Sequence, residues 1–87
     1  MKEVTMFVQS TCPHCKRCLS MMDEIRAEHP EYKGVNVTII DEKLDPVTAD
    51  KYDYFYVPTF FVAGVKEHEG APTPEAVKNV FKKAYEE

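Results

Sequence analysis

Two kinds of hydrophobic pattern alternate along the chain and predict two kinds of element. Residues 4–9 and 35–40 are rich in β-branched and other apolar side chains, which predicts two strands. Over residues 13–29 the apolar positions recur at steps of three and four, which predicts an amphipathic helix that Pro30 ends. A helix of this length between two strands predicts a β-α-β unit with a parallel strand pair.

The second half of the chain predicts a short helix, a hairpin and a final helix. Asp45 is a suitable N-cap for a short helix that fades near residue 52. Residues 59–62 and 65–69 predict two antiparallel strands joined by a tight turn that contains glycine. An apolar-periodic stretch over residues 73–86 predicts the last helix. The expected order of elements is therefore β-α-β-α-β-β-α.

The composition limits the classes of protein to which the chain can belong. Its 87 residues allow one small domain, over residues 1–87, and 44% hydrophobic with 30% charged residues is ordinary for a globular protein. The net charge of −4, without a long run of Lys or Arg, disfavours a nucleic-acid partner. No apolar stretch approaches the length of about 18 residues that a membrane span needs. Without a recognisable signal peptide, and with only three cysteines, we expect a cytoplasmic monomer.

Two cysteines separated by two residues, Cys12 and Cys15, follow the first predicted strand. At the start of a helix both sulfurs lie on the first turn, where they can form a disulfide or separate as a dithiol. Pro13 suits the first helical position, and the helix N-terminus favours a thiolate on Cys12. We therefore predict that Cys12 is the catalytic nucleophile and that Cys15 resolves the mixed disulfide.

The residues between the two cysteines are predicted to tune their redox potential. His14 can donate a hydrogen bond to the Cys12 thiolate or place positive charge beside it. A stabilised thiolate makes the disulfide more oxidising, so Pro13 and His14 are predicted to influence the redox potential of the pair. The alternative is that His14 is a solvent-facing spacer with a small effect.

The same cysteines also allow a metal-handling module as an alternative function. Cys12, Cys15 and Cys18 have the spacing of part of a ferredoxin cluster motif, but the fourth cysteine is missing. A second Cys-x-x-Cys pair, which would close a structural zinc site, is absent as well. Cys18 falls on the apolar stripe of the predicted helix, so we expect it to be buried and inert.

The element order, with Cys-x-x-Cys after the first strand and Val-Pro before the third, resembles the thioredoxin fold in its minimal, glutaredoxin-sized form. Residues 11–17 are similar to the glutaredoxin motif, residues 41–59 are similar to thioredoxins, and Gly70-Ala71 resembles the turn after the last strand in both families. The resemblance covers the whole chain. It implies an α/β fold, a four-stranded mixed sheet flanked by three helices, and a thiol–disulfide oxidoreductase that exchanges disulfides with protein substrates.

The resemblance also implies a substrate site. Pro58 would form a cis peptide bond and face the disulfide, and the backbone of Val57 would pair with a bound substrate as a short β-like segment. Thr11, directly before Cys12, is expected to line the same site. No bound cofactor is expected, because the cysteines carry the electrons. The implied partners are disulfide-containing proteins and an upstream reductase or glutathione.

The chain also departs from both families. Glutaredoxins typically have a lysine where this chain has Gln9, and Glu67 and Glu69 add negative charge near the glycine turn, which disfavours the glutathione anion. Thioredoxins have a tryptophan at the position of Thr11 and a buried aspartate at the position of Met6. The sequence therefore predicts a hybrid of the two families.

Overall fold

Four strands form a mixed sheet, and three α-helices cover its two faces. The computed structural model describes residues 1–87. The elements are β1 (Val4–Val8), α1 (Pro13–Glu28), the 3₁₀-helix η1 (Pro30–Gly34), β2 (Val37–Asp41), α2 (Pro46–Ala49), β3 (Thr59–Val62), β4 (Val65–Glu69) and α3 (Pro74–Glu86). The strand order is β2-β1-β3-β4; β1 and β2 are parallel, and the other neighbours are antiparallel. The predicted fold class and element order are confirmed.

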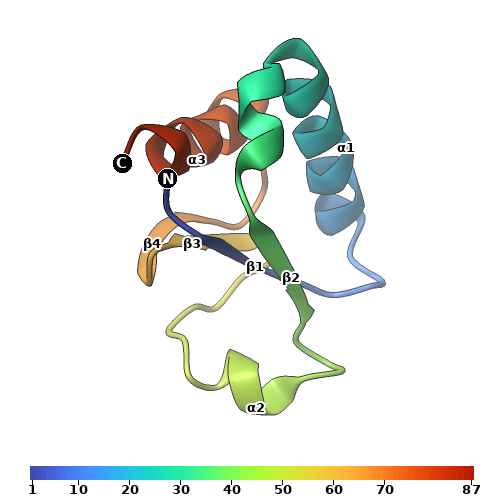
Figure 1. Ribbon diagram of the computed structural model, residues 1–87. Coiled ribbons are helices and arrows are strands. Elements are labelled where there is room, and N and C mark those ends of the chain that lie inside the picture. The colour runs from blue at the N-terminus through green and yellow to red at the C-terminus, as the bar shows by residue number, and fades with distance from the viewer.

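The sheet separates two apolar clusters. Figure 1 shows α1 and α3 together on one face of the sheet and α2 on the other. Because side chains alternate along a strand, Met6 of β1 belongs to the larger cluster and Phe7 to the smaller one. Phe61 and Ala49 complete the buried part of the smaller cluster. The first strand is thus covered on both sides, and it ends directly before the cysteine turn.

The larger cluster fixes the position of α1. In the predicted apolar stripe of this helix, four residues are buried and Leu19 is half-buried. The stripe meets a matching stripe on α3 and the strand residues Val4, Met6, Val8, Phe60 and Val62. Burying a large apolar side chain contributes about 1.5–3 kcal/mol, so the buried residues Met22 and Ile25 hold this helix firmly against the sheet. This packing holds the first turn of α1 beside the end of β1.

Several boundaries differ from the sequence prediction. The chain forms η1 after Pro30, and the N–H of Val35 donates to the carbonyl of Tyr32 at 3.1 Å, so β2 begins two residues later than predicted and ends one residue later. The helix α2 ends at Ala49. The turn then continues to Tyr52 through bonds that span three residues, the 3₁₀ pattern, and this explains the longer predicted helix.

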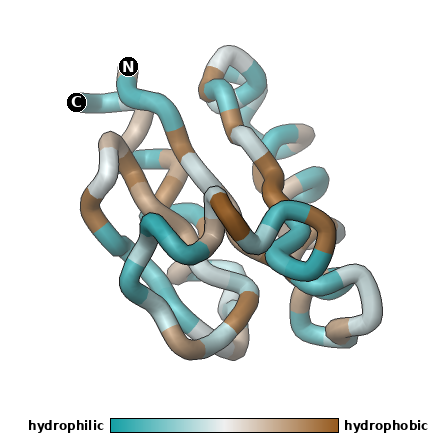
Figure 2. The backbone as a smooth tube through the Cα atoms, turned by 90° about the horizontal axis from the view of Figure 1, so that it is seen from below, coloured by the Kyte–Doolittle hydropathy of each residue, from teal (hydrophilic) through white to brown (hydrophobic).

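The two ends of the chain lie close together. The N–H of Lys2 donates to the carbonyl of Ala84 at 2.7 Å, and the two termini are neighbours in Figure 2 as in Figure 1. Among the helices, none combines the length and the apolar character that crossing a membrane requires.

Candidate active site

The two cysteines of the motif lie on the first turn of α1. Cys12 is the N-cap residue in an extended conformation, and Pro13 occupies the first helical position, as predicted. The N–H of Cys12 donates to the carbonyl of Gln9 at 3.0 Å, which closes the turn between β1 and α1. Cys12 is partly exposed, whereas Cys15 is 2% exposed. One sulfur therefore faces the surface, and the other lies beneath it.

The surroundings of Cys12 favour its thiolate. Partial burial raises the pKa of the Cys12 thiol, but three hydrogen bonds act in the opposite direction: the backbone and thiol of Cys15 and the backbone of His14 lower it. The pKa of Cys12 is therefore lower than that of an ordinary thiol. Backbone N–H groups at a helix N-terminus have no partner within the helix, so they are available to stabilise a thiolate there.

The other two cysteines are held as neutral thiols. Burial raises the pKa of Cys15 to about 11, and a hydrogen bond from the backbone of Gln9 offsets this only in part. Burial likewise raises the pKa of Cys18 to about 12. Cys18 has no exposed surface and belongs to the larger cluster, which agrees with its predicted burial. The three cysteines therefore differ in reactivity, and Cys12 is the one suited to attack.

The segment before β3 lies next to Cys12. The Val57–Pro58 peptide bond is cis, as the resemblance implied, and Pro58 is buried. The carbonyl oxygen of Val57 lies 3.9 Å from the Cys12 sulfur, within reach of a weak S–H···O bond. The N–H of Val57 has no hydrogen-bond partner within the protein. Thr11 is exposed in the turn directly before Cys12. The fold thus brings Val57 to Cys12 across 45 residues of chain.

His14 is exposed and contacts Arg17 one turn further along α1. The Arg17 Nη2 lies 2.6 Å from the His14 Nδ1. A guanidinium has no acceptor, so the His14 Nδ1 accepts this hydrogen bond from Arg17. Arg17 thus places a guanidinium beside the residue that the sequence analysis predicted to tune the thiol pair.

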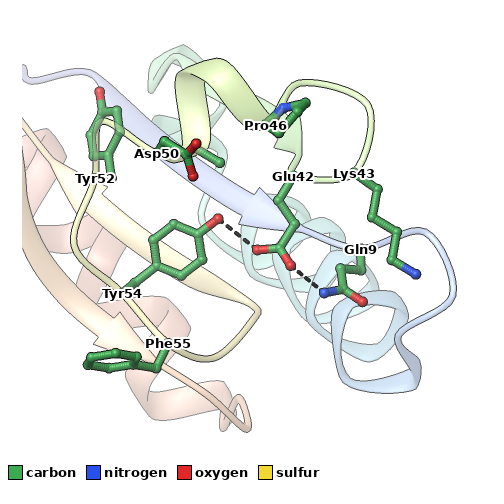
Figure 3. A pocket seen from close by; sticks show the side chains of 9 residues that line it. Gln9, Glu42, Lys43, Pro46, Asp50, Tyr52, Tyr54 and Phe55 are labelled. Carbon is green, nitrogen blue, oxygen red and sulfur yellow. Dashed lines mark hydrogen bonds between the residues drawn. The ribbon is translucent and has the colours of Figure 1, made fainter.

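A pocket of about 410 Å³ lies beside this turn, on the face of the sheet that α2 covers. Figure 3 shows Glu42 at its centre, between Gln9 and Tyr54. The Tyr54 hydroxyl donates to the Glu42 Oε1 at 2.7 Å, and the Gln9 side-chain amide donates to Oε2. The sequence analysis did not single out Glu42. The available signal was its place directly after β2, because the carboxyl ends of parallel strands meet at one edge of a sheet.

The residues do not gather into a metal centre. No group of three or more His, Cys, Asp or Glu side chains is arranged to hold a metal ion. Cys18 points into the core beneath Cys15, so the spacing that resembles a cluster motif does not produce a shared ligand set at the surface. This arrangement favours chemistry at the thiols themselves.

Comparisons with known proteins show the family to which the chain belongs. The sequence matches the family model of a thioredoxin domain over residues 2–82. The thioredoxin of Methanocaldococcus jannaschii is 33% identical, with 93% of each chain covered, and a probable thioredoxin of Methanothermobacter thermautotrophicus is 31% identical, with 83% of this chain and 82% of that one covered. The structure of oxidised thioredoxin from Plasmodium falciparum shares the fold, with a TM-score of 0.71 at 21% identity over 94% of this chain and 79% of that one. The chain therefore belongs to the thioredoxin domain family, a family of thiol–disulfide oxidoreductases.

Proposed function

We propose that the protein reduces disulfides in protein substrates, with Cys12 as the nucleophile and Cys15 as the resolving cysteine. The observation that carries this proposal is the contrast between the two thiols. Cys12 is partly exposed with a lowered pKa, and Cys15 is buried with its pKa raised to about 11. A surface thiolate is suited to attack a substrate, and a buried thiol is protected until a mixed disulfide forms beside it.

The proposed exchange proceeds in two steps. The Cys12 thiolate attacks one sulfur of the substrate disulfide, a bond forms between the two sulfurs, and the other substrate sulfur leaves as a thiolate that takes up a proton. The Cys15 thiol then loses its proton and attacks the Cys12 sulfur, which releases the second substrate thiolate to be protonated. Two electrons pass from the dithiol to the substrate, and the protein is left with a Cys12–Cys15 disulfide.

The substrate site is proposed to lie between the cysteine turn and the segment before β3. The free N–H of Val57 supports β-like pairing with an extended substrate segment next to the Cys12 sulfur. Phe55 and Tyr56 are 83% and 70% exposed, and they offer an apolar contact surface in the same segment. Pro58 and Thr11 are proposed to border the site on either side of Cys12.

The remaining proposals concern the setting in which the protein works. We propose a cytoplasmic monomer that is reduced by a flavoprotein reductase or by glutathione. The acidic side chains Glu42 and Glu69 near the site favour the reductase over the glutathione anion. Recycling assays with each donor distinguish them, because only the true donor will sustain turnover at low concentration.

Two cysteine variants test the assignment. Cys12→Ser should abolish reduction of a protein disulfide such as insulin, because serine cannot form the mixed disulfide. Cys15→Ser should accumulate mixed disulfides that are visible by mass spectrometry, because the resolving thiol is gone. Full activity in Cys12→Ser, or no trapped species with Cys15→Ser, would contradict the proposed roles.

A further inference from the structure

The carboxylate of Glu42 is fixed at the edge of the sheet from which the cysteine turn departs. We propose that Glu42 is an electrostatic tuning residue of the thiol pair, whose negative charge holds the disulfide at a more reducing potential than the Cys-Pro-His-Cys motif would give by itself. This inference rests on the proposed redox function. It assigns a role to a residue that lies outside the motif and does not touch the substrate disulfide.

Three hydrogen bonds hold Glu42 in place. Its backbone N–H donates to the carbonyl of Val8 at 3.0 Å, which anchors it to the last residue of β1. Its two carboxylate oxygens accept from the Tyr54 hydroxyl and the Gln9 amide. Figure 3 shows all three side chains converging within the pocket. A carboxylate that is engaged at both oxygens stays in position and cannot turn freely toward solvent.

Gln9 connects this carboxylate to both cysteines. Its carbonyl accepts from the N–H of Cys12 at 3.0 Å, and its own backbone hydrogen bonds to the Cys15 sulfur. Glu42 is half-buried, so solvent screens its charge less than that of an exposed carboxylate. In agreement with this geometry, the Glu42 charge raises the pKa of Cys12 and also that of Cys15, as a smaller contribution than burial in each case.

The other charged groups nearby do not take over this role. Lys43 and Asp50 line the same pocket, and Asp41 accepts a hydrogen bond from the N–H of Ser10 in the cysteine turn, but none of the three is among the leading causes of the pKa shifts of the two thiols. Lys43 extends away from the Glu42 carboxylate in Figure 3. The exposed His14 ring is engaged by Arg17 on α1 and does not line this pocket.

The direction of the effect follows from the charges of the two redox states. The disulfide is uncharged, whereas the dithiol carries a thiolate on Cys12 once the pH exceeds the pKa of that thiol. A fixed negative charge therefore disfavours the reduced state in that range and makes the disulfide a weaker oxidant. Well below the pKa of Cys12 both thiols are neutral, and the effect disappears.

The test compares the wild-type protein with Glu42→Gln, which keeps the shape and removes the charge, and with Asp50→Asn, which removes a carboxylate from the same pocket. Two quantities are measured across pH: the Cys12 titration, by thiolate absorbance, and the equilibrium between the protein dithiol plus oxidised glutathione and the protein disulfide plus two glutathione molecules. We expect Glu42→Gln to lower the pKa of Cys12. Above that pKa, the equilibrium should shift about threefold to tenfold toward the dithiol, equivalent to about 15–30 mV.

The controls make the result decisive. Asp50→Asn should match the wild type, and all three proteins should converge at low pH. If Glu42→Gln does not fold, Tyr54→Phe frees the carboxylate to turn toward water, and it should give a smaller shift in the same direction. A Glu42→Gln protein with the wild-type titration and equilibrium, or an equal shift in Asp50→Asn, would overturn the inference. Failure of every variant to form the disulfide would instead overturn the proposed function.

Discussion

Replacing Cys18 separates a structural cysteine from a redox-active one. Cys18 has no exposed surface, its neighbours are the apolar side chains of the larger cluster, and burial raises its pKa to about 12. Its thiolate is therefore scarcely populated at neutral pH, and no exchange reaction should pass through it. We expect Cys18→Ala to keep the full disulfide-reducing activity of the wild type.

The cost in stability follows from the burial. Cys18→Ala removes one buried atom of about methyl size, so we expect a loss of about 1 kcal/mol in the free energy of unfolding. Cys18→Ser keeps the volume but buries a hydroxyl, which costs about 1–3 kcal/mol without a good partner.

Urea unfolding and insulin reduction measured on the same samples test this order. The serine variant should be the least stable of the three proteins, and all three should have the same activity per folded molecule. A loss of activity in folded Cys18→Ala would refute the structural role. A serine variant as stable as the wild type would refute the dry environment inferred for this side chain.

Two further predictions concern the aromatic packing around Phe7 and the ionised carboxylate of Glu69. Phe7→Leu should lose about 1.5–4.5 kcal/mol in the free energy of unfolding by urea, because the ring centre of Phe7 lies within 6 Å of three aromatic ring centres and each such pair is worth about 0.5–1.5 kcal/mol. A loss below about 0.5 kcal/mol would contradict this packing. Glu69 accepts hydrogen bonds from the backbone of Phe55 and from Lys66, and these lower its pKa from the ordinary 4.5 to about 2. The ionised Glu69 carboxylate therefore stabilises the folded protein above pH 4.5, and this stabilisation is lost as the pH falls toward 2. The thermal unfolding midpoints of the wild type and Glu69→Gln should differ at pH 6 and converge near pH 2.

The fold was predictable because its signals are local. Periodicity over residues 13–29 indicated α1, and the glycine turn after Val62 indicated the β3–β4 hairpin, so the element order followed. The helix η1 was missed because Pro30 was taken only as a stop signal. Proline, which lacks an N–H, also suits the first turn of a new helix. Because η1 occupies Pro30–Gly34, β2 begins only at Val37.

The candidate site was predictable only where its residues are close in sequence. Cys12 and Cys15 lie on one helical turn, so their pairing needed no knowledge of the tertiary structure. Glu42 was missed, and its hydrogen bond from Tyr54 was not foreseen, because these residues meet Gln9 only after β2 pairs with β1 and the loop after α2 folds back. Val57 and Pro58 were placed beside the cysteines by family resemblance, since no local pattern connects them.

The most direct test of this account is a redox titration of the wild-type protein in graded glutathione buffers, followed by alkylation and peptide mass analysis. We predict that two thiols disappear together at one defined potential and that both map to Cys12 and Cys15, while Cys18 stays reduced throughout. A disulfide that includes Cys18, or the absence of any two-electron step, would contradict the assignment of the redox centre.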